Sequence, residues 1–245
     1  MTLFLASVRD EADAEMALLA RADIIDLKEP SRGALGAIDR AKAKSIISAI
    51  AGRATVSTTI GDLPMVAETI REAVLDRAAC GVDYVKFGLF PDGDPRGCLE
   101  ELRPLAHRVS LIVVLFADRL PDFDAVAAAA DMGAAGIMLD TAGKSSGSLL
   151  DHLDVAGVAH FVTSAKAQGL AVGLAGSLTA AEVPKLLALV PDLLGFRGAL
   201  CHASRSSSLN PLACAAIRSL IPEAAPGPTY GPRTKLQGAP AQALC

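Results

Sequence analysis

Residues 22–37 read ADIIDLKEPSRGALGA. The first part is a short apolar run around Ile24, and its β-branched residues predict a buried strand. Asp26 and Lys28 then fall where that strand is expected to end, before a loop that contains two glycines. Because a carboxylate and an ammonium are both costly to bury, a chain that places them together at the end of a core strand must either pair them or use them.

The same pattern, an apolar run followed by a stretch of helical character, recurs along most of the chain. Apolar runs that predict strands occupy residues 2–8, 22–28, 53–60, 82–90, 110–117, 134–141, 170–177 and 192–199. Stretches of helical character follow at residues 10–21, 40–51, 64–80, 99–107, 122–133, 157–168, 179–190 and 210–221. Strands that alternate with helices indicate parallel βαβ units, and eight such units predict an α/β fold, a single (β/α)8 TIM barrel.

A doubly wound parallel sheet is the alternative architecture. Such sheets usually have fewer strands, and many carry a glycine-rich turn after the first one. Here the first predicted strand ends in SVRD, residues 7–10, without a GxGxxG pattern, so the barrel is favoured. The barrel is expected to occupy residues 1–222 as one catalytic domain. The Pro- and Gly-rich segment 223–245 is expected to be a flexible C-terminal tail.

The composition argues against several classes of function. Of the 245 residues, 51% are hydrophobic and 20% are charged, and a net charge of −4 offers no basic surface to nucleic acid. No apolar run approaches the ~18 residues of a membrane span, and the first residues lack the basic flank of a signal peptide. The five cysteines form no CxxC pair and the four histidines show no metal-ligand spacing. We therefore expect a reduced, cytoplasmic protein without a metal site.

Ionisable side chains stand at or near the carboxyl ends of three predicted strands. In barrels the side chains at those ends face the active site, and residues two apart share one face of a strand. The candidate catalytic residues, from the second, fourth and sixth strands and the loop after the sixth, are Asp26, Lys28, Lys86, Asp140 and Lys144. We expect them to form one cluster.

Two interpretations of this cluster are open at this point. In the first, the charges form structural ion pairs, with Lys28 bound to Asp26. Lys86 would then pair with Asp140. In the second, one lysine is a nucleophile, because burial and a neighbouring ammonium lower a lysine pKa and the neutral amine can attack a carbonyl carbon. The product is a Schiff base, and the carboxylates would relay protons and hold the iminium.

Small residues end the seventh and eighth predicted strands, in the sequences GLAGSL and GFRGAL. The loops after these two strands are the usual phosphate-binding loops of barrels, and small residues let backbone N–H groups approach an anion. The predicted phosphate-binding residues are Gly176, Ser177 and Gly198, with Arg197 as a charged partner.

Two acidic residues have local interpretations. Asp62, beyond the third predicted strand, is either one more carboxylate at the rim of the site or the N-cap of a helix that begins near Pro64. Thr179 and Glu182 match a capping box, in which Glu182 reaches back to the N-cap. Because Pro184 follows so closely, that helix is expected to bend or to begin later.

The motifs then show a resemblance to a known family. The sequences ADIIDLKEPSRGALGA, STTIGDLP, DYVKFGL, MLDTAGKSSGSLLDHLD, GLAGSL and GFRGALC occur in order between about residues 5 and 201. Together they resemble the (5-formylfuran-3-yl)methyl phosphate synthase family. The resemblance implies a lyase, a TIM barrel similar to a class I aldolase, that condenses two molecules of glyceraldehyde 3-phosphate with loss of phosphate and water. Its product would serve the biosynthesis of methanofuran or a related one-carbon carrier.

The resemblance also implies a role for each candidate residue. Lys28, in DLKEP, would be the Schiff-base nucleophile, with Asp26 beside it. Lys86, in DYVKFGL, would be an acid/base, and Asp140 and Lys144, in LDTAGK, would complete the proton-transfer group. No metal or organic cofactor is implied. The expected partner is the triose phosphate substrate, with neither nucleic acid nor membrane, and barrels of this size often form homo-oligomers.

Two further functions remain as alternatives. One is a cofactor-independent sugar-phosphate isomerase or epimerase, or another class I aldolase, on the same barrel, with Asp26 or Asp140 as base in the isomerase case. The other is a regulator that binds a sugar phosphate without consuming it. Reduction by borohydride separates them, because only a Schiff base is trapped as a permanent adduct.

Overall fold

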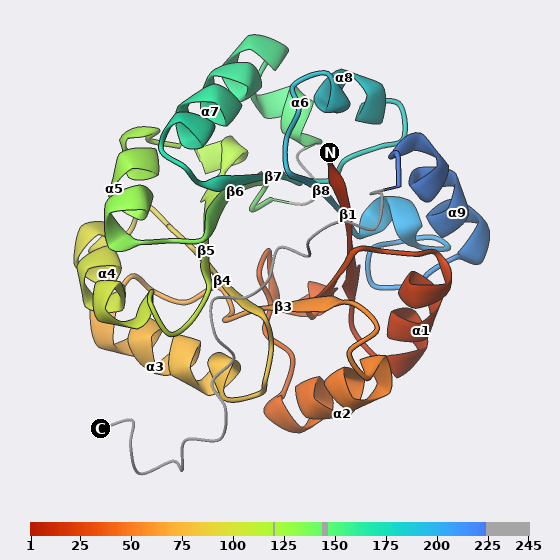
Figure 1. Ribbon diagram of the computed structural model, residues 1–245, viewed down its shortest axis with the longest axis horizontal. Coiled ribbons are helices and arrows are strands. Elements are labelled where there is room, and N and C mark those ends of the chain that lie inside the picture. Colours follow the sequence, from red (N-terminus) through yellow and green to blue (C-terminus); the bar gives the residue numbers. More distant parts are fainter. Residues whose placement is uncertain (120, 144–146, 224–245) are drawn as a thin grey trace.

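The fold is a closed barrel of eight parallel strands in sequence order, surrounded by helices, and the predicted fold is confirmed (Figure 1). The structure is a computed structural model that describes residues 1–119, 121–143 and 147–223. The predicted tail lies almost entirely outside the described residues, so the domain boundary at residue 222 stays a prediction. Self-association and partner molecules also stay predictions.

The strands are short and lie within the eight predicted apolar runs. They are β1 (Leu3–Val8), β2 (Ile24–Leu27), β3 (Thr55–Thr59), β4 (Tyr84–Gly88), β5 (Leu111–Phe116), β6 (Gly136–Asp140), β7 (Ala171–Leu174) and β8 (Leu193–Phe196). β8 pairs with β1 and closes the ring. Because β7 and β8 end earlier than predicted, the residues proposed to bind phosphate lie beyond them in loops, as an anion site built from backbone N–H groups requires.

Helices cover the outside of the barrel and connect the strands (Figure 1). The α-helices are α1 (Glu11–Leu19), α2 (Arg40–Ile50), α3 (Ala67–Ala78), α4 (Pro95–Leu102), α5 (Asp124–Met132), α6 (Leu149–His152), α7 (Val155–Ala167), α8 (Val183–Leu187) and α9 (Pro211–Leu220). Short 3-10 helices are η1 (Pro30–Arg32), η2 (Arg103–Leu105), η3 (Ala117–Arg119) and η4 (Gly198–Leu200). The four-residue helix α6 was not predicted. Among the described residues, no helix has both the length and the apolar character needed to cross a membrane.

Helix ends follow the local sequence. Pro95 occupies the first turn of α4, and the carboxylate of Asp94 accepts a hydrogen bond from Gly97 N, so this helix begins before the predicted residue 99. Glu182 reaches back to the N–H and hydroxyl of Thr179, as the capping-box pattern predicts, at 2.7 Å in both cases. The α-helix itself begins only at Val183, so Thr179 is not its N-cap.

The core has two layers, one outside and one inside the ring of strands. Alternate strand residues, such as Val85 and Phe87 on β4, are buried in the large cluster that packs the helices onto the barrel. The opposite face of β4 carries Lys86 into the barrel, where its register neighbour on β5 is Ile112. Phe116 also belongs to the inner cluster. Side chains therefore fill the interior of the barrel.

Gly136, in β6, is a position where close approach of two strands requires glycine. A Cβ added there would lie 2.6 Å from the backbone oxygen of Ala171 on β7, which cannot move without shifting the strand. We expect Gly136→Ala to destabilise the protein by about 1–3 kcal/mol, the usual cost of overpacking. Differential scanning calorimetry should show a Tm lower by several degrees. Gly157→Ala in α7, where the nearest atom is a flexible carboxylate at 3.2 Å, is the control and should not lower Tm.

Candidate active site

Asp26, from β2, is a carboxylate with no exposed surface inside the barrel. The register places Ser7 of β1 and Ser57 of β3 on either side of it. Ser7 Oγ donates to Asp26 Oδ2 at 3.0 Å and Ser57 Oγ donates to Oδ1 at 2.7 Å. Both oxygens therefore have a hydroxyl partner, which offsets part of the cost of burying a polar group.

Lys86, from β4, provides the opposite charge. Its Nζ lies 2.7 Å from Asp26 Oδ1, and both side chains are almost fully buried. Burial lowers the pKa of Lys86 below its ordinary value, and the nearby Lys28 ammonium lowers this pKa further, while Asp26 and Asp140 act against both effects. The structure thus supplies an amine that loses its proton more readily than an ordinary lysine.

Lys28, the first residue after β2, pairs with Asp140, the last residue of β6. Their Nζ and Oδ2 atoms are 3.4 Å apart, a long contact between two buried side chains. Asp140 Oδ1 accepts a hydrogen bond from Thr141 N at 2.7 Å, which fixes the orientation of the carboxylate. Lys28 is therefore held more loosely than Lys86.

One cavity joins these four residues. It is open toward solvent, and its empty volume of about 350 Å³ includes part of the open space at the mouth. Its lining includes the two lysines, the two aspartates and Ser7, together with residues of the β7 and β8 loops: Lys28, Lys86, Asp26, Asp140, Ser7, Gly176, Ser177 and Arg197. The structure therefore brings the described members of the predicted cluster together. Lys144 lies outside the described residues.

The ion pairs that the structural interpretation of the cluster implies are not the ones formed. That interpretation pairs Lys28 with Asp26 and Lys86 with Asp140. The structure shows the crossed arrangement, with Lys86 bound to Asp26 and Lys28 next to Asp140. The reason is geometric: Lys86 comes from inside β4 and lies level with the middle of the barrel, whereas Lys28 follows the end of β2 and lies nearer the mouth.

The loop after β7 is shaped for close approach of the backbone. Gly176 has φ of 105°, and a Cβ there would lie 2.9 Å from Thr141 Cγ2 and 3.0 Å from Thr141 N. Ser177 also has a positive φ, 49°. Among the described residues, none accepts a hydrogen bond from the N–H of Gly176 or Ser177. Gly198, the first residue of η4, is exposed and follows Arg197, which lines the cavity.

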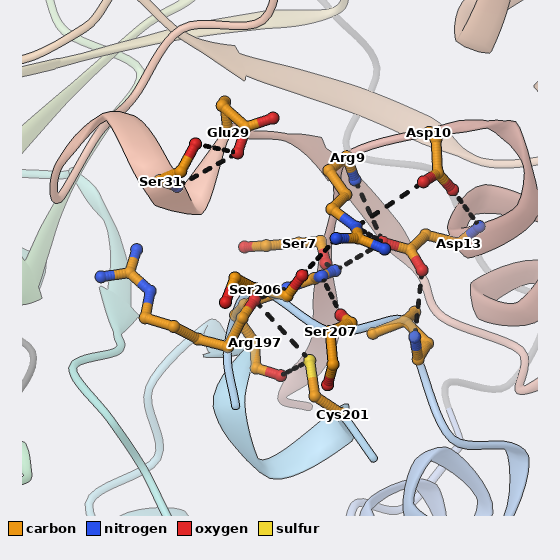
Figure 2. Close-up of polar contacts among 12 residues, drawn as sticks. Ser7, Arg9, Asp10, Asp13, Glu29, Ser31, Arg197, Cys201, Ser206 and Ser207 are labelled. Carbon is orange, nitrogen blue, oxygen red and sulfur yellow. Dashed lines mark hydrogen bonds and ion pairs between the residues drawn. The ribbon is translucent and has the colours of Figure 1, made fainter. Parts of the chain in front are cut away.

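The guanidinium of Arg197 already has protein partners. Nη1 donates to Asp13 Oδ2 at 2.7 Å and to the Ser7 carbonyl at 3.0 Å. Nε and Nη2 donate to the carbonyls of Arg205 and Ser207 at 2.7 and 2.6 Å. Figure 2 shows Arg197 and Arg9 meeting at Asp13. Arg197 thus ties the loop after β8 to β1 and α1, and its predicted contact with phosphate stays a prediction.

Asp118, in η3, holds the loop that follows Asp140. Its two carboxylate oxygens accept hydrogen bonds from Ala142 N at 2.7 Å and Gly143 N at 2.6 Å. Burial acts to raise the pKa of Asp118, but these two backbone hydrogen bonds outweigh it and hold the pKa below its usual range. The β6 loop is therefore fixed by a carboxylate from the neighbouring β5 loop.

Asp62 is not the N-cap of the next helix. The helix after β3 begins at Ala67, and Val66 is its N-cap. Instead, the two Asp62 oxygens accept hydrogen bonds from Ala34 N and Leu35 N, both at 2.7 Å. Asp62 therefore fixes the loop after β2, which begins with Lys28, in the same way that Asp118 fixes the loop after β6.

Sequence reasoning missed Ser7 and Ser57 as members of the site. Both are polar residues inside buried strands, and this is the signal that could have identified them. Their contact with Asp26 depends on the register of β1, β2 and β3, which no single strand reveals. Among the described residues, no group of His, Cys, Asp and Glu is placed to hold a metal ion.

Paired lysines and aspartates, buried in an open cavity at the carboxyl ends of barrel strands, are typical of an active site, so we class the chain as a TIM-barrel enzyme. Comparison with known proteins identifies the family of this chain. Residues 4–218 match the family model of 4-HFC-P synthase. The chain therefore belongs to the 4-HFC-P synthase family, an enzyme family of methanofuran biosynthesis.

Individual relatives agree with this assignment. The (5-formylfuran-3-yl)methyl phosphate synthase of Methanopyrus kandleri is 36% identical over 208 residues, covering 79% of this chain and 86% of the relative. A Methylorubrum extorquens protein that carries the same name provisionally is 40% identical over 200 residues, 82% of this chain and 83% of the relative. Phosphoribosyl anthranilate isomerase from Thermus thermophilus shares the fold, with a TM-score of 0.64 at 17% identity over 90% of this chain and 98% of that one.

Asp118→Asn tests the anchoring of the β6 loop. The amide keeps one acceptor but removes the charge and the second hydrogen bond, so urea unfolding at pH 7 should show a loss of about 1–3 kcal/mol. Because the folded-state pKa of Asp118 is lowered, its contribution is complete above the unfolded value of about 3.9 and is lost as the pH falls through the folded value. The difference between wild type and variant should therefore shrink in acid.

The control for this experiment is Asp131→Asn, which changes an exposed aspartate of α5 and should unfold like the wild type. Equal stability of Asp118→Asn and the wild type at pH 7 would show that the two hydrogen bonds do not hold the loop.

Proposed function

We propose that this enzyme condenses two molecules of glyceraldehyde 3-phosphate to (5-formylfuran-3-yl)methyl phosphate, through an imine on Lys28. The observation that carries the proposal is the cavity in which two lysines and two aspartates are buried together. Family membership supports the product, and the crowded amines support the chemistry, because imine formation needs a neutral amine close to groups that accept and return protons.

The geometry favours Lys28 over Lys86 as the nucleophile. Lys86 Nζ is bound at 2.7 Å to Asp26, which is itself held by two hydroxyls, so attack by this amine would break a buried ion pair. Lys28 Nζ has only a 3.4 Å contact with Asp140 among the described residues, and it lies nearer the mouth. Because Lys28 is held more loosely than Lys86, its amine can turn toward a carbonyl carbon at a smaller cost in free energy.

The other residues then have proton-transfer roles. Attack of the neutral Lys28 amine on the aldehyde carbon gives a carbinolamine. Its hydroxyl takes a proton from the Lys86 ammonium and leaves as water, and Asp140 faces the positive charge of the iminium that remains. In its neutral form Lys86 can accept the proton that leaves the carbon next to the iminium, which gives an enamine. Asp26 remains a fixed anion that holds the protonated form of Lys86. The enamine carbon can then attack the aldehyde of the second triose phosphate.

The loop after β7 supports the phosphate part of the proposal. Gly176 and Ser177 line the same cavity as the lysines, and no acceptor among the described residues binds their N–H groups; Gly198 lies on the adjacent loop. Backbone N–H groups are suitable donors for a phosphate, and this is the usual place for one in a barrel. We assign the phosphate of the imine-bound triose to this loop. Synthesis of methanofuran or a related carrier from triose phosphates would place the reaction in the cytoplasm.

Borohydride reduction in the presence of glyceraldehyde 3-phosphate tests the proposal. Only an imine is converted to a permanent secondary amine, so peptide mapping should find the added mass on Lys28 in the wild type. Lys28→Arg should give no adduct at this position and no furan product, because a guanidinium stays protonated. Ultraviolet absorbance and product mass report the furan.

Lys185→Arg, which changes an exposed lysine of α8, is the matched control and should keep both the adduct and the product. Full activity of Lys28→Arg would contradict the proposal. Turnover of the sugar phosphate without any adduct in the wild type would favour an isomerase, and saturable binding without turnover would favour a regulator.

The lowered pKa of Lys86 predicts the pH dependence. If neutral Lys86 removes a proton, kcat should rise with pH and reach its plateau below the ordinary lysine value of about 10.4. Lys86→Arg keeps a cation for Asp26 but cannot accept a proton, so kcat should fall about 10²–10⁴-fold and the rise with pH should disappear. Lys86→Gln serves as a second variant, and the Tm values of Lys86→Arg and Lys86→Gln separate the loss of kcat from a folding defect. An unchanged pH profile in Lys86→Arg would exclude the role.

A further inference from the structure

The loop between η4 and α9 is held by arginines through its backbone. The carbonyl of Ser207 accepts a hydrogen bond from Arg197, and the carbonyl of Ser206 accepts one from Arg9 Nη1 (Figure 2). The carbonyl of Arg205 accepts a second hydrogen bond from Arg197. Three successive carbonyls are therefore fixed by side chains that follow β8 and β1. Such a loop presents the side chain of Arg205 from a defined position.

The side chain of Arg205 extends to the loop after β2. Its Nη2 donates to the Gly33 carbonyl at 3.2 Å, and Gly33 is followed by the two N–H groups that Asp62 binds. The guanidinium is half-buried and interacts electrostatically with Asp140 and Asp62. It therefore lies over the part of the mouth between β8 and β2, within electrostatic range of Asp140, the carboxylate beside Lys28.

Arg205 is a cation without a matching anion in contact. The other buried cations of this region each have a carboxylate within 4.0 Å: Lys86 has Asp26, Lys28 has Asp140 and Arg197 has Asp13. Within residues 1–119, 121–143 and 147–223, Arg205 forms no such ion pair, and its recorded side-chain hydrogen bond is to a neutral carbonyl. Burial acts against its charge, so a bound anion would offset a cost that the protein alone leaves in place.

The proposed reaction requires two anion sites. Each glyceraldehyde 3-phosphate carries a phosphate, and the carbon–carbon bond forms between the two carbon chains, so the phosphates must be held apart. The loop after β7 can hold one of them. Along the ring of strands, the mouth between β8 and β2 lies between the loop after β7 and Lys28, and there the described cation with no carboxylate partner is Arg205.

We propose that Arg205 binds the phosphate of the second triose phosphate, the one that accepts the enamine. This inference rests on the proposed function and deepens it, because it assigns the two substrates to separate subsites. Arg205 acts as a binding residue, and its planar guanidinium can donate two parallel hydrogen bonds to a phosphate. Arg197 is then a positioning residue that fixes the loop on which Arg205 stands.

Arg205→Gln tests the assignment, with Arg103→Gln as the matched control on an exposed arginine next to α4. In Arg205→Gln, the KM for furan formation should rise about tenfold to a hundredfold, as expected for the loss of a hydrogen bond between charged groups. Inhibition by inorganic phosphate should weaken by a similar factor. The borohydride adduct on Lys28 should still form, because the first triose binds elsewhere. Arg205→Lys should restore part of the affinity.

Three results would overturn the inference: an unchanged KM together with unchanged phosphate inhibition, a loss of the Lys28 adduct in step with the product, or equal defects in Arg103→Gln. Failure of the proposed function looks different, since the wild type would then give neither adduct nor furan. In that case, calorimetry of inorganic phosphate binding tests the anion site at Arg205 independently of the reaction. Weaker binding by Arg205→Gln supports an anion site, and equal binding overturns it. Equal Tm values for the variants exclude a folding defect.

Discussion

The buried ion pair between Asp26 and Lys86 is the interaction on which the site depends. A carboxylate with no exposed surface is stable inside a barrel only if its charge is matched, and Ser7, Ser57 and Lys86 together provide that match. The pair occupies the middle of the barrel and leaves the space above it to Lys28. The same burial that makes the pair costly also makes the amine of Lys86 easier to deprotonate, so one physical cause serves both structure and chemistry.

Loops at the mouth are held by a common device, a charged side chain from one loop that binds the backbone of another. Asp62 binds two N–H groups after β2, and Asp118 binds two N–H groups after β6. Arg197 binds carbonyls after β8. Because these charged side chains bind backbone groups, the side chains that perform the chemistry are not needed to hold the loops. A site of this kind can keep its geometry while substrates enter and leave.

The sequence predicted the parts of this structure that depend on local patterns. Strand and helix alternation is local, and positions within or at the ends of strands bring Asp26, Lys28, Lys86 and Asp140 to one cavity once the fold is a barrel. Pairing between the four was not predictable, because it depends on how far each residue lies along its own strand relative to the others. Arg205 was not predicted for a related reason. It lies in a serine-rich loop whose path across the mouth is set by tertiary contacts.

The most direct test of the account is the titration of the Lys86 amine itself. Nuclear magnetic resonance of lysine-labelled protein, with the signal assigned by its loss in Lys86→Arg, reports the protonation of this one side chain as the pH is changed. We expect a midpoint below the ordinary lysine value of about 10.4, because burial and a second ammonium outweigh the attraction of Asp26. A midpoint at or above that value would contradict it.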